Sequence, residues 1–262
     1  RLDRSVVHAF RESKEPTMQN RLFNYPSFGP ALETGDYDVV LLDAWKTLFR
    51  GPYPEPPGDT QEILRYKTRM TPEGPKVDEV DPEFLHVCLT TNIEDEYDFL
   101  CYLAEKFGLP RPTDEQHRQF RALIESEKMG LSVFLDVEEE LQNLRDRSYR
   151  IGLLSNVWPF PIKYLLKRKR LDQYFEHLIL SYEVGFAKPS PEIFHVACQK
   201  FGVSRERCLM VGDSPSLDIV GALNFGMPAV HIDRYPNHPS PQRIQGVPVI
   251  GELSELYRGV GG

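Results

Sequence analysis

The sequence has no run of about 18 apolar residues, few cysteines and no excess of positive charge. A membrane-spanning helix needs roughly 20 such residues, so we expect no membrane partner. The net charge of −8 argues against nucleic-acid binding, which depends on cationic side chains against phosphates. It still allows a local cationic pocket for a small anion. The first ten residues lack a sustained apolar segment, so no secretory leader is expected there.

The cysteines are too few and too scattered for a disulfide framework or a zinc site. None forms a C-x-x-C pair, and no histidine lies at metal-ligand spacing from one. We therefore expect reduced, mostly buried thiols in a cytoplasmic protein. The four positions are Cys88, Cys101, Cys198 and Cys208.

The stretch from residue 39 to residue 49 organises the interpretation of the chain. Four apolar residues lead directly into Asp43. A short apolar run that ends at a polar residue is typical of a strand buried on both faces of a parallel sheet. Ligands bind beyond the carboxyl ends of such strands, so Asp43 is our candidate nucleophile. The alternative is a strand-end aspartate that only fixes the next turn.

Beyond residue 130, apolar runs typical of strands alternate with helical patterns. This alternation indicates right-handed βαβ units around a parallel sheet, and therefore an α/β protein. One of the helices is expected to begin at a cap formed by Asp136 with Glu139. The predicted later strands cover residues 149–154, 177–180, 207–211, 228–232 and 247–250.

The rest of the chain divides into three parts. Residues 1–35 show no clean period and are interpreted as an N-terminal arm. Residues 59–130 follow a proline-rich break and show helical patterns, so they are interpreted as a small helical insert. A capping box of Thr113 with Gln116 predicts one helix start within it. The α/β core then consists of residues 36–58 and 131–262.

Three predicted strands end in polar residues at what should be one edge of the sheet, namely Asp43, Ser155 and Asp213. Lys188 lies between the second and third of these positions in the sequence, and Asp218 lies in the first turns of the helix expected to begin near Pro215. Carboxylates suit a hard cation such as Mg²⁺, and a lysine ammonium suits a phosphoryl oxygen. These residues predict a site for a small anionic substrate with a divalent cation, where a carboxylate can act as covalent nucleophile.

Four segments in order, DAWKTLF, LLSN, AKPSPEIF and VGDSPSLD, resemble the haloacid dehalogenase superfamily of hydrolases. The resemblance covers residues 36–52 and 131–251. It implies a Rossmann-like, three-layer core with a parallel sheet and a small helical cap inserted after the first strand. The roles that it implies are Asp43 and Lys188 as catalytic residues, Ser155, Asn156 and Thr47 in substrate binding, Asp43, Asp213 and the backbone carbonyl of Trp45 as Mg²⁺ ligands, and Asp218 in support.

The sequence departs from the family's phosphatases at one position. Those enzymes carry a second aspartate two residues after the nucleophile as general acid and base, and this chain has Trp45 there. Indole has no proton to exchange in the useful range, and acid–base help is worth about 10²–10⁴ in rate. Lys46 replaces the small residue usual at the next position. It would lower the pKa of the nucleophile or contact the substrate, unless it is a solvated turn residue.

Dehalogenases of the family also lack the second aspartate, because a halide leaves without a proton. They lack the metal as well, whereas Gly212 and Asp213 keep the metal-binding form of the last motif. We therefore favour a Mg²⁺-dependent phosphatase that acts on a small phosphorylated metabolite through an aspartyl-phosphate. The alternatives are a 2-haloacid dehalogenase-like hydrolase and a non-catalytic binding protein in which Trp45 fills the old site. A homodimer is compatible with the sequence.

Overall fold

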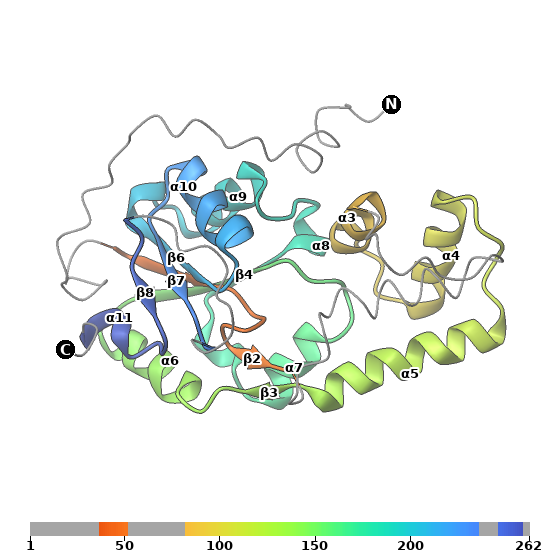
Figure 1. Ribbon diagram of the computed structural model, residues 1–262, viewed down its shortest axis with the longest axis horizontal. Helices are drawn as coiled ribbons and strands as arrows, with labels where there is room; N and C mark the ends of the chain where they lie inside the picture. Colours follow the sequence, from red (N-terminus) through yellow and green to blue (C-terminus); the bar gives the residue numbers. More distant parts are fainter. Residues whose placement is uncertain (1–36, 52–81, 236–245, 259–262) are drawn as a thin grey trace.

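The computed structural model describes residues 37–51, 82–235 and 246–258. The predicted N-terminal arm lies outside these residues, as do the proline-rich break and the first part of the predicted insert. Figure 1 shows the described part as an α/β core with a group of helices to one side.

The centre of the described fold is a six-stranded parallel sheet in the order β5-β4-β1-β6-β7-β8. All six strands match the predicted ones to within two residues at each end. The β1 strand is completely buried, as its unbroken apolar run predicts. The strands are β1 (Val39–Leu42), β4 (Arg150–Ser155), β5 (His177–Leu180), β6 (Cys208–Gly212), β7 (Ala229–Ile232) and β8 (Val249–Ile250).

The β1 strand lies between β4 and β6, and the chain runs outward from it in both directions. Leu42 is opposite Leu153 of β4 and Val211 of β6. The residues that follow these three positions therefore emerge at the same edge of the sheet. This edge lies at the point where the strand order reverses, which is where open α/β sheets bind ligands.

Helices cover both faces of the sheet, which confirms the predicted three-layer architecture. Alternate residues of β1 point to opposite faces: Val40 and Leu42 pack in one apolar cluster, and Val39 and Leu41 pack in the other. The first cluster includes residues of α6 (Val137–Asp146), α7 (Ile162–Arg168) and α11 (Glu255–Arg258), and the second includes residues of α9 (Pro191–Phe201), η3 (Pro215–Val220) and α10 (Gly221–Phe225). Short helices η1 (Asp172–Tyr174), α8 (Ser181–Val184) and η2 (Arg205–Arg207) occupy connections.

The predicted cap at the start of α6 is wrong. Asp136 stands at the N-cap position, but its side chain makes no hydrogen bond to the helix. Its carboxylate instead accepts hydrogen bonds from Arg234 and from the backbone N–H of Leu253. A tertiary contact has replaced the local one.

The described part of the predicted insert is helical and has its own apolar cluster. It comprises α3 (Pro82–Thr90), α4 (Glu96–Lys106) and α5 (Asp114–Gly130). The capping box of Thr113 and Gln116 is confirmed at the start of α5. The cluster of buried insert residues also takes in Trp158 from the core. Figure 1 shows α5 running from the core outward toward α4, with α3 lying beside α8 of the core.

The insert is flanked by two very short strands that sequence analysis missed. β2 (Phe49–Arg50) pairs antiparallel with β3 (Ser132–Val133). Each has only two residues, one of them polar, so neither forms an apolar run or an alternating pattern. Their pairing brings the two sides of the insert together at one place on the core, although the exact limits of the insert, 59 and 130, stay a prediction.

Candidate active site

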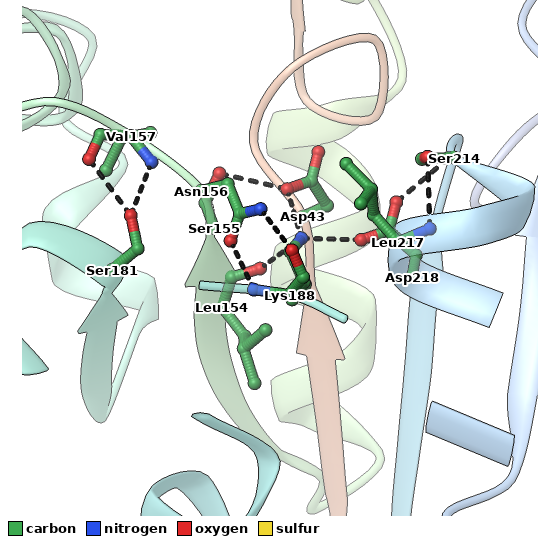
Figure 2. A network of polar contacts seen from close by, with 10 residues as sticks. All are labelled: Asp43, Leu154, Ser155, Asn156, Val157, Ser181, Lys188, Ser214, Leu217 and Asp218. Carbon is green, nitrogen blue, oxygen red and sulfur yellow. Dashed lines mark hydrogen bonds and ion pairs between the residues drawn. The ribbon is translucent and has the colours of Figure 1, made fainter. Parts of the chain in front are cut away.

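Asp43 lies directly beyond the carboxyl end of β1 and is almost fully buried. Its backbone N–H donates to the carbonyl of Val211 on β6, at 3.0 Å. Its Oδ1 atom accepts hydrogen bonds from Ser155 Oγ at 2.9 Å and from Lys188 Nζ at 2.7 Å. No group among the described residues donates to Oδ2. One carboxylate oxygen is therefore held in place while the other is left available (Figure 2).

The ammonium of Lys188 is buried and has three oxygen partners. Besides Asp43, it donates to Asp218 Oδ1 at 2.5 Å and to the carbonyl of Leu154 at 2.9 Å. Burial by itself lowers the pKa of Lys188, but the nearby carboxylates of Asp218 and Asp43 outweigh it and the pKa is raised. The side chain is therefore a cation at neutral pH, with all three N–H donors used.

Asn156 holds the backbone of Lys188 from both sides. Its Nδ2 donates to the Lys188 carbonyl at 2.8 Å, and its Oδ1 accepts from the Lys188 N–H at 2.7 Å. The amide side chain thereby fixes the position of the lysine, although the two residues are 32 positions apart in the sequence. Direct substrate binding by Asn156 stays a prediction.

Asp218 contacts the ammonium of Lys188 from the other side. Its Oδ2 accepts the backbone N–H of Ser214 at 2.9 Å, so both of its oxygens are occupied. The carboxylate also lies against Gly212, where any Cβ atom would overlap it. Burial raises the pKa of Asp218 to about 6, against the opposing effect of Lys188. Glycine is therefore required at the end of β6 by the carboxylate beside it.

Asp213 completes a group of carboxylates with Asp43 and Asp218, whose oxygens lie within 4.8 Å of one another. Its carboxylate accepts no hydrogen bond from the described residues. Burial, followed by the charges of Asp43 and Asp218, raises the pKa of Asp213 to about 8. Three acidic groups thus face one lysine ammonium, and two of them keep an oxygen without a donor. This donor set fits a hard divalent cation, which prefers carboxylate oxygens.

Trp45 and Thr47 lie in the turn after Asp43. The indole ring of Trp45 is half-buried and packs on Phe49, with ring centroids 5.9 Å apart. It does not separate the carboxylates, whose oxygens are too close together to admit a ring between them. Thr47 is fully buried, and its hydroxyl has no hydrogen-bond partner among the described residues. Its proposed contact with substrate stays a prediction.

Two residues near this edge were missed by sequence analysis. His231 on β7 places Nε2 3.0 Å from the carbonyl oxygen of Asp213. Arg234, which follows β7, donates to the carbonyl of Thr47. Arg234 follows the predicted strand 228–232, so the rule that selected Asp43 would have found it, whereas His231 lies within that strand. The structure does bring together the side chains of Asp43, Ser155, Lys188, Asp213 and Asp218, which the sequence placed at one edge.

The fold and the carboxylate–lysine group at the reversal point of its sheet define a Rossmann-like hydrolase. Sequence comparison makes the class specific. Residues 37–226 match the family described as haloacid dehalogenase-like hydrolase, and the chain belongs to that family.

Relatives within the family include both phosphatases and dehalogenases. Phosphoserine phosphatase of Thermus thermophilus is 32% identical over 155 residues, which are 59% of this chain and 60% of that protein. (S)-2-haloacid dehalogenase 4A of Burkholderia cepacia is 30% identical over 127 residues, 48% of this chain and 54% of that protein. The chain thus matches between about half and three-fifths of the length of these two relatives.

Solved structures give the same picture. A HAD phosphatase from Thermococcus onnurineus has a TM-score of 0.54 and 27% identity, covering 84% of this chain and 95% of that one. A 2-haloacid dehalogenase from Pseudomonas syringae has a TM-score of 0.57 at 22% identity, covering 84% and 96%, and shows the shared fold. The choice between the two chemistries therefore rests on the site.

Proposed function

We propose that the protein is a Mg²⁺-dependent phosphatase that hydrolyses a small phosphorylated metabolite through an aspartyl-phosphate on Asp43. The observation that carries this proposal is the pair of Asp43 oxygens: Oδ1 is fixed by Ser155 and Lys188, and Oδ2 has no donor among the described residues. Oδ2 attacks phosphorus, and the bond from phosphorus to the leaving alcohol breaks. Water then attacks the phosphorus of the aspartyl-phosphate, which releases phosphate and restores the carboxylate.

Mg²⁺ would be held by Asp43, Asp213 and the backbone carbonyl of Trp45. The ion would supply positive charge against the phosphoryl oxygens and between the repelling carboxylates. The raised pKa of Asp213, to about 8, supports this assignment, because burial and two neighbouring carboxylates disfavour its charge without a cation. Lys188 would attract the phosphoryl group as a second fixed charge, and Ser155 would orient Asp43.

The absence of an aspartate at position 45 limits which leaving groups the proposed enzyme can release efficiently. Trp45 supplies no proton to the departing alkoxide, so the proposed enzyme favours esters whose leaving group is stable as an anion. The same absence is the observation that supports the second candidate, a 2-haloacid dehalogenase, in which Asp43 would displace halide from carbon. The acidic group around Asp43 argues for the phosphatase, because it would repel a carboxylate substrate in the absence of a cation.

Hydrolysis of p-nitrophenyl phosphate, measured with Mg²⁺ and with EDTA, tests the proposal. We expect turnover only with Mg²⁺ and its loss in Asp43→Asn. Asp38→Asn is the matched control, because Asp38 precedes β1 at the opposite end and pairs with Arg207. Halide release from 2-chloropropionate in EDTA would instead establish the dehalogenase. Turnover in Asp43→Asn equal to the wild type would refute both, and no turnover on either substrate would favour a binding protein.

We also infer a cytoplasmic location and a small-molecule partner. All four cysteines are free thiols, which supports a reducing compartment. No helix among the described residues is long and apolar enough to cross a bilayer. A homodimer stays a prediction, which size-exclusion chromatography with light scattering would test.

A further inference from the structure

Arg234 is a buried arginine whose guanidinium donates hydrogen bonds to the turn after the candidate nucleophile. Its side chain is 3% exposed and lies two residues beyond the end of β7. Nε and Nη2 both donate to the carbonyl oxygen of Thr47, at 3.2 and 2.8 Å. Nη1 donates to Asp136 Oδ2 at 2.7 Å, and the guanidinium carbon lies 4.5 Å from the centre of the Phe134 ring. Neither Arg234 nor Asp136 belongs to the predicted site.

The turn that Arg234 contacts packs Ala44, Leu48 and Phe49 into the core and has backbone hydrogen bonds of its own. Its internal hydrogen bonds are short-range: the N–H groups of Leu48 and Phe49 both donate to the carbonyl of Ala44, and the N–H of Lys46 donates to the carbonyl of Phe49. Lys46 has a φ of 55°, in the left-handed backbone region that residues other than glycine, asparagine and aspartate rarely adopt. A turn of this kind persists when contacts from outside hold it.

Arg234 supplies such a contact because its other partners are themselves fixed. Asp136 also accepts the backbone N–H of Leu253 at 3.0 Å, which ties it to the segment after β8. The N–H of Phe134 donates to the carbonyl of Leu48 at 3.1 Å. The guanidinium therefore lies between a carboxylate and an aromatic ring, and its Nε and Nη2 atoms are directed at the carbonyl of Thr47.

We infer that Arg234 is a positioning residue for the segment that carries Asp43 and the Trp45 carbonyl. The inference rests on the proposed function, since it gives Arg234 a part in catalysis through that segment. If Arg234 only stabilised the fold, its replacement would lower the free energy of unfolding and leave the turnover of folded molecules unchanged. A positioning arginine would change turnover and the local stability of the turn beyond any global effect.

The chain provides a matched control in Arg150 at the start of β4. Arg150 also binds one carboxylate, Glu176, at 2.5 and 2.8 Å. It donates to the carbonyl of Phe201 at 2.8 Å, and its guanidinium lies 4.9 Å from the centre of that residue's ring. It thus makes the same three kinds of contact as Arg234, but at the opposite end of the sheet from Asp43.

The experiment compares Arg234→Met, Arg234→Lys and Arg150→Met. It measures kcat and KM on p-nitrophenyl phosphate, thermal unfolding, and amide hydrogen exchange at Lys46, Leu48 and Phe49. We expect Arg234→Met to lower kcat by about 10²-fold with a smaller change in KM, because a misplacement of roughly 1 Å has this effect. Exchange at the three amides should accelerate in the same variant. Arg150→Met should unfold at a lower temperature and keep the wild-type kcat and the wild-type exchange at the turn.

Arg234→Lys separates charge from geometry. Lysine keeps a cation beside Asp136 but loses the paired donors to the Thr47 carbonyl, so kcat should stay low while the unfolding temperature recovers. Arg234→Lys also tests the inference if Arg234→Met fails to fold. A wild-type kcat in Arg234→Lys, with unchanged exchange at the turn, would overturn the inference. Should the wild type itself lack phosphatase activity, the proposed function fails, and the exchange data alone decide whether Arg234 holds the turn.

Discussion

At the scale of single residues, the three carboxylates of the site differ in what surrounds them. Asp218 has both oxygens occupied, Asp43 has one, and Asp213 has none among the described residues. A carboxylate with both oxygens bound orients its neighbours, whereas one with a free oxygen can attack or bind a cation. These surroundings support Asp218 as a structural partner of Lys188, and Asp43 and Asp213 as the reactive and metal-binding groups.

Gly212→Ala should inactivate the enzyme through Asp218. The new Cβ would occupy the place of the Asp218 carboxylate, which must then move away from Lys188. We expect kcat to fall by at least roughly 10²-fold and the free energy of unfolding to drop by about 1–3 kcal/mol. Kinetics and urea unfolding of the purified variant measure both.

Gly152→Ala is the control for that variant. Its Cβ would overlap the side chains of Leu41 and Phe201, 2.7 Å away, in the core below the site. It should cost about as much stability as Gly212→Ala while leaving kcat per folded molecule unchanged. Equal loss of kcat in both variants would show that overpacking of the sheet, rather than the Asp218 contact, is responsible.

Trp45→Asp should restore general acid catalysis for esters with poor leaving groups. An aspartate at this position can donate a proton to a departing alkoxide, and this help is worth up to about 10²–10⁴ in rate. The gain should appear on alkyl phosphates and be small for p-nitrophenyl phosphate, whose leaving group needs no proton. The ratio of kcat/KM on the two ester types measures it. An equal change on both would contradict an acid–base deficit at position 45.

At the scale of elements, the loop after β4 joins the site to the helical insert. It follows Ser155, the last residue of β4, begins with Asn156 and then places Trp158 and Phe160 among the aromatic rings of the insert. The Phe160 ring lies 5.2 Å from Phe99 and 5.5 Å from Phe120, between centroids. A shift of the insert would therefore act on the loop that holds Asp43 and Lys188.

Phe160→Ala should loosen the insert and weaken substrate binding more than chemistry. Half-buried Phe160 loses its ring contacts with α4 and α5, at a cost of roughly 1–3 kcal/mol. We expect faster amide exchange in these helices and a rise in KM larger than any fall in kcat. Phe225→Ala is the control, because Phe225 is partly buried and stacks on Phe194, with ring centroids 6.0 Å apart, away from the insert. An unchanged KM in Phe160→Ala would separate the insert from substrate binding.

At the scale of the whole molecule, the acidic group should link stability to pH and to Mg²⁺. In the metal-free protein, burial raises the pKa of Asp213 from 3.8 to about 8. Between these values the folded state binds more protons than the unfolded state, so the free energy of unfolding falls as pH rises. Burial likewise raises the pKa of Asp218, to about 6, which adds to the fall in the lower part of this window.

Mg²⁺ should reverse this loss, increasingly as the pH rises toward 8. A cation bound to the folded state at 100 times its Kd adds about 2.7 kcal/mol. Thermal unfolding in EDTA and in Mg²⁺ from pH 5 to pH 8, within the window between the pKa of 3.8 and the folded-state pKa of about 8, measures the effect. Asp213→Asn should be more stable than the wild type in EDTA at the upper end and gain little from Mg²⁺. If the stability of Asp213→Asn responded to pH and to Mg²⁺ as the wild type does, Asp213 would not be the group that links stability to them.

The six strands, most of the helices and the residues that follow the central strands could be predicted from the amino-acid pattern alone. These features depend on local periodicity and on the rule that parallel strands share a carboxyl edge. Asp43, Ser155 and Asp213 could be placed together for that reason. Strands β2 and β3 and the contacts of Asp136 could not be predicted, because none of them follows from an apolar run or a periodic pattern.

Which oxygen of Asp43 is free, and which groups hold the residues around it, depends on contacts between distant parts of the chain. Lys188 has three oxygen partners from three segments, and Arg234 reaches the carbonyl of Thr47 across 187 positions of the chain. Such pairings depend on how helices and loops pack against the sheet. Packing sets the distances between side chains that are remote in the sequence, and no local pattern of residues encodes these distances.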